Sequence, residues 1–235
     1  MTEISKTADQ ALAILTAVVE HGPIGAQDLS RELGCNRTVA HRLLATLHRR
    51  GFVRKQGSRY TVGPYLLRLV HQAGPAMLAR ARPVLRDLAA QHGETFLLTV
   101  ADGDDAVAVD QAIGDRHPVR IQLSIGDRHP LTVGASGRAI LAFSGDKQVT
   151  RALAAHDDPA RLGEILAVVK ELGYAQSHDE LNANVSGISV PIFEEDGLAL
   201  ASLTALLPAD RADKAVALVP ELRSAARLVE SLLRG

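Results

Sequence analysis

Residues 26–50 read AQDLSRELGCNRTVAHRLLATLHRR, and this stretch decides the fold of the N-terminal part of the chain. Residues 26–33 keep Leu29 and Leu33 on one side of a helix, and Gly34 follows, where a left-handed residue often ends a helix. Residues 37–50 are predicted to form a second amphipathic helix, for which Asn36 is a suitable N-cap. Its apolar stripe consists of Val39, Leu43, Leu44 and Leu47. Two short helices joined by a tight, glycine-containing turn predict a helix-turn-helix.

The segments on either side extend this motif to a winged helix-turn-helix. Upstream, residues 6–20 place apolar side chains at helical spacing, and His21-Gly22-Pro23 ends that helix. Downstream, residues 52–55 and 59–62 are predicted to be two short strands, with Gln56-Gly57-Ser58 as the turn between them. This hairpin would be the wing.

Charge is unevenly distributed along the chain. The net charge is −1, from 26 Lys/Arg and 27 Asp/Glu. Residues 1–62 contain nine basic and five acidic side chains, a balance of +4, which leaves 17 basic and 22 acidic, or −5, for residues 63–235. Residues 31–62 alone hold eight basic side chains and one acidic. Such a basic window favours binding to a polyanion, although a solvated helix face would show the same charges.

The order of these elements, together with the basic window, predicts DNA binding. The second helix fits the major groove of B-DNA, where an arginine can donate two hydrogen bonds to guanine, and the wing would contact the flanking backbone or the minor groove. The candidate DNA-binding residues are Asn36, Arg37, Thr38, His41, Arg42, Arg49, Gly57, Ser58 and Arg59. A palindromic operator in double-stranded DNA needs a symmetric reader, so we expect a homodimer through the N-terminal domains. The alternative is a protein–protein module, because winged-helix folds also serve in that role.

Beyond residue 63 the pattern changes to that of a mixed domain. Helices are predicted at residues 65–73, 76–91, 136–143, 147–154, 159–172 and 210–233, and strands at 95–101, 106–113, 119–123, 186–193 and 199–206. The first two strands would form a hairpin. The predicted fold class is α+β, with a winged helix-turn-helix in residues 1–63, a linker helix in 64–75, and a sensor-like domain with an antiparallel sheet in 76–235.

Several motifs resemble those of the IclR family of bacterial regulators, over nearly the full length of the chain. Residues 38–47 (TVAHRLLATL), 51–53 (GFV) and 60–63 (YTVG) resemble its recognition helix and wing, and residues 82–89 (RPVLRDLA) its interdomain helix. Residues 126–131 (GDRHPL) followed by 135–142 (ASGRAILA) match its most distinctive signature. The family's spacing is also matched by Gly173-Tyr174-Ala175, Glu180, Pro191-Ile192-Phe193 and Pro208. The resemblance implies a GAF-like effector-binding domain, dimers that pair into tetramers, and a ligand-responsive regulator of a catabolic or metabolic operon, with repression favoured over activation.

In that family the effector lies in a cup on one face of the sheet. The resemblance implies that the N–H groups of Ala135 and Ser136 would meet a ligand carboxylate, and a helix start after Gly134 independently offers such unpaired donors. The candidate effector-binding residues are Phe96, Leu98, Ala135, Ser136, Gly137, Ser177, Gly187, Thr204 and Leu206. Some carboxylate-sensing members have an acidic group and paired hydroxyls where this chain has Ser177, Gly187 and Leu206. These differences favour a larger, aromatic or less polar small-molecule effector over a small keto acid.

Enzyme and metal chemistry are weaker interpretations. A nucleophile elbow would require glycine where Arg138 stands, and no nucleophile, base and orienting group assemble in the sequence, so we expect neither an enzyme nor a cofactor. The pentapeptide GDRHP occurs twice, at residues 114–118 and 126–130. Its candidate metal ligands are Asp115, His117, Asp127 and His129. Neither copy has the compact spacing of a zinc motif, so a structural turn is favoured, and whether His117 and His129 bind a metal stays open.

The remaining features are those of a protein that works in the cytoplasm. No apolar run reaches the roughly 18–20 residues that span a bilayer, and the N-terminus has no signal-peptide core. We therefore expect a cytoplasmic protein that makes no membrane contact. The single cysteine, Cys35, cannot form an intramolecular disulfide, and packing is favoured over a redox role.

Overall fold

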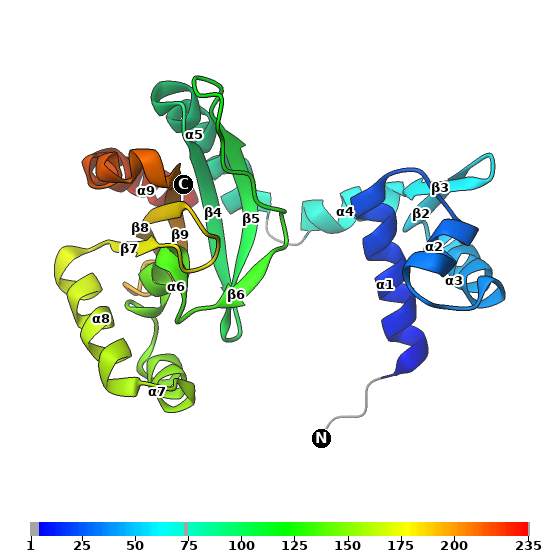
Figure 1. Ribbon diagram of the computed structural model, residues 1–235, viewed down its shortest axis with the longest axis horizontal. Helices are drawn as coiled ribbons and strands as arrows, with labels where there is room; N and C mark the ends of the chain where they lie inside the picture. Colours follow the sequence, from blue (N-terminus) through cyan, green and yellow to red (C-terminus); the bar gives the residue numbers. More distant parts are fainter. Residues whose placement is uncertain (1–4, 73–74, 235) are drawn as a thin grey trace. The chain divides into compact units, whose positions relative to one another are not determined.

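The computed structural model describes residues 5–72 and 75–234, and the chain divides into two compact units, residues 1–75 and 76–235 (Figure 1). Each unit has its own hydrophobic core. The division falls at a Gly-Pro pair, a sequence that interrupts regular structure. Within the two described ranges, no helix combines the length and the apolar composition that crossing a membrane would require.

The N-terminal unit is a helix-turn-helix followed by a hairpin. Its elements are α1 (Lys6–His21), β1 (Ile24–Gly25), α2 (Ala26–Glu32), α3 (Arg37–Arg49), β2 (Val53–Gln56), β3 (Arg59–Val62) and α4 (Pro64–Gln72). The Asn36 side chain accepts a hydrogen bond from the Thr38 N–H at 2.8 Å, which confirms Asn36 as the N-cap of α3. Strand β1 was not predicted. It pairs with β3, so the wing is part of a sheet in the order β1-β3-β2.

The core of this unit forms because each helix turns one apolar face inward. Leu43, Leu44 and Leu47 of α3 are buried together with Leu29 of α2 and residues of α1. Cys35 lies half-buried in the turn between α2 and α3, where it packs against this core as predicted. Its carbonyl oxygen accepts a hydrogen bond from the Ser30 hydroxyl at 2.6 Å, which fixes the turn that connects the two helices.

The C-terminal unit is an antiparallel sheet with helices on both faces. Its elements are α5 (Pro75–His92), β4 (Thr95–Asp102), β5 (Asp105–Ile113), β6 (Arg128–Pro130), α6 (Gly134–Leu141), α7 (Asp146–Ala155), α8 (Pro159–Leu172), β7 (Ala175–His178), β8 (Val185–Phe193), β9 (Ala199–Pro208), two 3₁₀ turns (Ala209–Lys214 and Val216–Leu218) and α9 (Val219–Arg234). The strand order is β6-β5-β4-β9-β8-β7. One face of the sheet packs under α5 and α9, and the other packs under α6, which is followed by α7 and α8 (Figure 1).

The prediction of a strand at residues 119–123 is wrong. This segment lies in a connection, residues 114–127, which joins β5 to β6 and which we call the strap. Side chains hold it in place of a strand ladder: Thr95 Oγ1 donates to the Ile121 carbonyl oxygen at 2.5 Å, and the Gln111 amide bonds both the N–H and the carbonyl of Leu123. The edge strand is instead β6, where part of the second GDRHP copy pairs with β5. Strand β7 at the opposite edge was also not predicted.

A buried ion pair fastens the strap to the 3₁₀ turn that precedes α9. Arg211 donates to both carboxylate oxygens of Glu94, at 2.6 and 2.9 Å, and to the Val119 carbonyl of the strap at 3.2 Å. The hydrogen bond to Glu94 raises the pKa of the Arg211 guanidinium above its ordinary value. His117, from the first GDRHP copy, lies 3.6 Å from the same carboxylate.

Candidate functional site

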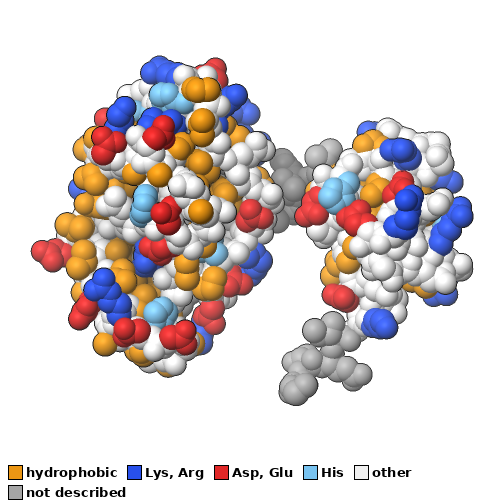
Figure 2. All heavy atoms as spheres, viewed as in Figure 1, with side chains coloured by type: hydrophobic (Ala, Val, Ile, Leu, Met, Phe, Trp, Pro, Cys, Tyr) orange, Lys and Arg blue, Asp and Glu red, His pale blue; other side chains and the backbone are white. Residues whose placement is uncertain are grey.

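Helix α3 separates an apolar face from a polar one. Ala40, Leu43, Leu44 and Leu47 are buried, whereas the candidates Thr38, His41, Arg42 and Arg49 are exposed. At 100° per residue these four exposed side chains fall within one arc of the helix surface. Figure 2 shows Lys and Arg side chains on the visible face of this unit. The helix therefore presents a polar, basic face of the size that the major groove accepts.

The start of α3 and the wing enclose one hollow, of about 340 Å³. The candidates Arg37 and His41 of α3 line it from one side, and Ser58 and Arg59 of the wing line it from the other. Lys55 also lines this hollow and was missed, although it belongs to the basic window that the sequence showed. Further lining comes from Gly25, Ala26, Gln27, Asp28 and Tyr60. Basic groups from two elements thus converge on one concave surface, which suits a phosphate backbone.

Three of the candidates also have structural roles. Asn36 uses its side-chain oxygen to cap α3, as described above. Arg59 donates to the Pro23 carbonyl oxygen at 3.0 Å, which ties the wing to the segment before β1. Gly57 has φ +60°, a left-handed value that the hairpin turn requires of it. The Arg59 contact holds the hairpin against the segment before β1.

In the C-terminal unit, four effector candidates converge at the start of α6. Ser177, Gly187 and Leu206 lie opposite one another on β7, β8 and β9, so they share one face of the sheet. A Cβ atom added at Gly187 would lie 3.0 Å from Ser177 Oγ, 3.4 Å from Ala135 Cβ and 3.6 Å from Leu206 Cδ2. Glycine at position 187 therefore allows Ser177, Ala135 and Leu206 to approach the backbone of β8 closely.

Polar side chains lie beneath α6 on the same face. The Ser202 hydroxyl donates to the Ser136 carbonyl oxygen at 3.0 Å, and Thr204 shares a hydrogen bond of 2.8 Å with Ser189. Thr99, opposite Ser202 on β4, is 1% exposed, and its hydroxyl has no hydrogen-bond partner among the described residues. Burying this hydroxyl without a hydrogen-bond partner destabilises the folded state.

The candidate Gly137 packs against the segment after β6. A Cβ atom there would lie 2.8 Å from the Leu131 carbonyl oxygen, so glycine allows α6 to approach the segment after β6. Gly137 therefore positions α6 against Leu131.

Phe96 and Leu98 do not lie on the face of the sheet that carries the other effector candidates. Both are fully buried in the core under α5 and α9, on the opposite face of the sheet from α6. Leu97 lies between them and points to the α6 face, because successive residues of a strand alternate. An apolar compartment under the strap consists of Leu97, Ala108 and Leu206, with Ile121, Leu123 and Val185 packed against them.

The start of α6 has polar partners that the sequence did not reveal. One carboxylate oxygen of Glu180 accepts a hydrogen bond from the Gly134 N–H at 3.0 Å. The other accepts a hydrogen bond from the Arg138 guanidinium at 2.5 Å. Arg138 is buried and also donates to the Gln176 carbonyl at 3.0 Å. The helix start therefore already has one carboxylate at its first N–H group. The N–H groups of Ala135 and Ser136 lie in the first turn, where the helix itself supplies no acceptor.

The second GDRHP copy places its histidine at the start of α6. His129 Nε2 lies 3.1 Å from Ser136 Oγ. The first copy instead places His117 beside Glu94. Across the part of the chain that the structure describes, no group of three or more His, Cys, Asp or Glu side chains could hold a metal ion.

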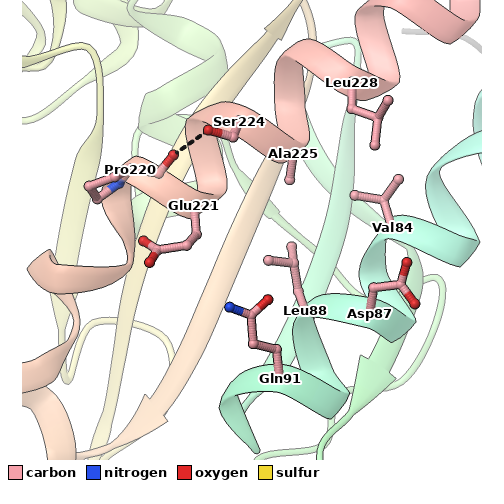
Figure 3. Close-up of a pocket in the computed structure, with 9 residues that line it drawn as sticks. All are labelled: Val84, Asp87, Leu88, Gln91, Pro220, Glu221, Ser224, Ala225 and Leu228. Atoms are coloured by element: carbon pink, nitrogen blue, oxygen red, sulfur yellow. Dashed lines mark hydrogen bonds between the residues drawn. The ribbon is translucent and has the colours of Figure 1, made fainter.

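A second cavity, of about 470 Å³, lies between α5 and α9, on the other side of the sheet. Figure 3 shows the carboxylates of Asp87 and Glu221 at its walls, together with Leu88 and Leu228. Two carboxylates would repel an anionic ligand, so this groove is a poorer place for a carboxylate than the start of α6.

Comparison with known proteins agrees with this architecture. A family model for the IclR helix-turn-helix domain matches residues 7–57, and a model for the bacterial transcriptional regulator IclR C-terminal domain matches residues 75–231. The chain belongs to the IclR family. It is a DNA-binding transcriptional regulator.

Three members show how far the likeness extends. The transcriptional repressor IclR of Escherichia coli is 27% identical over 219 residues, which are 86% of this chain and 80% of that protein. A putative IclR regulator from a Silicibacter species is 31% identical, with a TM-score of 0.71 over 96% of each chain. An IclR homologue from Microbacterium hydrocarbonoxydans, solved with 4-hydroxybenzoate, is 23% identical, with a TM-score of 0.80 over 97% of this chain and 99% of that one.

Proposed function

We propose that this IclR-family regulator binds a palindromic operator as a homodimer, with α3 in the major groove and the wing on the flanking backbone. The observation that carries this proposal is the convergence of Arg37 and His41 with Lys55, Ser58 and Arg59 around one hollow. A helix with exposed Arg42 beside such a hollow suits base readout combined with phosphate contacts.

Binding to the DNA upstream of the protein's own gene tests this proposal. The variant Arg42→Ala should weaken specific binding by about 1–3 kcal/mol if Arg42 reads a base, and should leave non-specific binding nearly unchanged. If Arg42 contacts only phosphate, specific and non-specific DNA should lose affinity alike. Arg86→Ala, an exposed arginine in the other unit, is the matched control. Absence of binding at low salt, with and without candidate ligands, would refute the operator proposal.

We propose further that the effector binds between α6, the sheet and the strap. The carboxylate of the effector would accept hydrogen bonds from the N–H groups of Ala135 and Ser136. The rest of the effector would lie against Gly187, Leu97 and Leu206. The apolar compartment supports a larger or aromatic carboxylate, and 4-hydroxybenzoate on the Microbacterium homologue belongs to that class.

A thermal-shift comparison tests this effector class. Benzoates should raise the melting temperature of the C-terminal unit more than pyruvate does, because a ligand that binds only the folded state stabilises it. Gly187→Ala should reduce the benzoate shift, since the new methyl group would crowd Ser177 and Ala135 at the proposed site. A larger shift with pyruvate would contradict the proposed preference.

Three further parts of the proposal concern repression or activation, the oligomeric state and the cellular compartment. Repression of a catabolic or metabolic operon is supported by relatives named transcriptional repressor IclR and acetate operon repressor. The dimers would pair into tetramers, and the protein would act in the cytoplasm, because its target is DNA. A reporter fused to the adjacent operon should rise when the gene is deleted, and light scattering gives the mass of the assembly.

A further inference from the structure

A further hollow of the C-terminal unit lies at the end of β8 that β7 leaves uncovered. Strand β7 pairs only with residues 186–189 of β8, so residues 190–193 lie at an edge of the sheet. Residues of α8, of α9 and of this edge enclose the hollow, which has a volume of about 400 Å³. None of the candidate effector residues lines it, so it is separate from the proposed effector site.

Three basic side chains line this hollow. Lys170 belongs to the last turn of α8, and Arg223 and Arg227 lie one turn apart on α9. All three are exposed, and the ion pairs found among the described residues involve none of them. Residues 63–235 otherwise carry more acidic than basic side chains, 22 against 17. A local excess of positive charge on an acidic unit therefore favours an anion at this hollow.

The carboxylate that lines the hollow is bonded to the backbone. Glu230 Oε1 accepts a hydrogen bond from the Phe193 N–H at 2.9 Å, and Pro191 of the same edge has no N–H to donate. Glu230 thus satisfies a backbone donor of the uncovered edge and does not pair with the basic side chains. Three positive charges and one negative charge leave the lining with a balance of +2.

One of the three basic groups has a structural role that the other two do not share. The Arg223 guanidinium donates to the Leu172 carbonyl oxygen at the C-terminal end of α8, which ties α8 to α9. Arg227 has only a 3.4 Å contact with the Ser224 hydroxyl, and Lys170 makes no side-chain hydrogen bond within the described ranges. Capping the end of α8 therefore accounts for one basic group and leaves two for a ligand.

The rest of the lining is mostly apolar. The rings of Phe143 and Phe193 meet edge to face, with their centroids 5.2 Å apart. Val190 and Ala226 contribute further apolar surface. A ligand with an apolar body would bury surface against these side chains, whereas a bare inorganic anion would not.

We propose that this hollow is a second small-molecule site, and that its ligand is a phosphate monoester with an aromatic body. Two guanidinium groups and one ammonium group can bond the oxygens of one phosphate, whose charge near neutral pH approaches −2 and so matches the lining. The volume of about 400 Å³ falls in the range of small-molecule sites, roughly 300–1,000 Å³.

Calorimetry on the full-length protein without DNA tests the chemical class of the ligand. The probe is phenyl phosphate at about pH 7.5, where its phosphate is mostly dianionic. Phenol lacks the charge and inorganic phosphate lacks the ring, so phenol should give no measurable heat and inorganic phosphate should bind about tenfold more weakly. Raising the salt concentration from about 0.05 to 0.3 M should weaken the binding of phenyl phosphate, because the basic groups are exposed.

Charge-removing variants test the place. Lys170→Gln and Arg227→Gln should each weaken phenyl phosphate binding by about two- to fivefold, as expected for exposed charge pairs, and together by about tenfold. Both side chains are exposed, so circular dichroism should show an unchanged fold. Arg86→Gln, an exposed arginine on α5 that does not line the hollow, is the matched control and should keep the wild-type affinity.

The outcomes distinguish this inference from the effector site of the proposed function. Gly187→Ala, which crowds that site, should keep the wild-type affinity for phenyl phosphate. If Gly187→Ala weakens phenyl phosphate binding and the two charge variants do not, the ligand occupies the effector site and the second site is refuted. Absence of binding to the wild-type protein, or equal affinities of the wild-type protein and the double charge variant, also overturns it. Inorganic phosphate binding as tightly as phenyl phosphate would refute the aromatic body.

Discussion

Replacing Thr99 by valine should stabilise the C-terminal unit. Thr99 is 1% exposed and its hydroxyl has no hydrogen-bond partner among the described residues. An unsatisfied buried hydroxyl costs about 1–3 kcal/mol, and valine has nearly the same shape without that group. We therefore expect the free energy of unfolding to rise by about 1–2 kcal/mol, which is a few degrees in melting temperature for a unit of this size.

Thr95→Val is the matched control on the same strand. Thr95 is equally buried, but its hydroxyl donates to the Ile121 carbonyl oxygen at 2.5 Å. Its removal should cost about 1–2 kcal/mol, because the strap then loses a hydrogen bond. Urea unfolding followed by circular dichroism should show the two variants moving in opposite directions. If Thr99→Val loses as much stability as Thr95→Val, the Thr99 hydroxyl has a partner and the reasoning fails.

Two further predictions concern the N-terminal unit. Asn36→Ala removes the cap on the Thr38 N–H and should lower the stability of this unit by about 1 kcal/mol, while Asn36→Asp should retain it; calorimetry distinguishes the two. Gly63→Ala should cost about 3 kcal/mol or more in a denaturant titration, since its Cβ would lie 2.1 Å from the Gly51 carbonyl oxygen. Gly57→Ala, with open space around it, should cost only about 1 kcal/mol, and an equal loss at both positions would contradict the steric explanation.

The N-terminal unit could be predicted closely because its signals are local. The apolar spacing of α3, the Asn36 cap and the turn around Gly57 all lie within a few residues of the structure they determine. Strand β1 was missed because two residues carry no periodic pattern, and its pairing with β3 depends on a contact far along the chain.

The candidate effector site could be predicted only in part, because its remaining determinants are non-local. Phe96, Leu97 and Leu98 are consecutive apolar residues in a strand covered on both faces, so alternation cannot tell which face each one takes. The strap alternates apolar and polar residues as a strand would, yet the place beside β5 is taken by β6. No spacing rule connects Arg138 with Glu180, 42 residues later.

The lone thiol in the turn between α2 and α3 makes the protein convenient for spectroscopy. Because Cys35 is the only cysteine in the sequence, each copy accepts one label, with no competing position to remove by mutation. Any energy transfer or spin–spin coupling between labels must then arise from two copies that have come together. Since the thiol directly precedes the cap of α3, the label also lies beside the helix proposed to enter DNA, and its signal reports on assembly and on operator binding together.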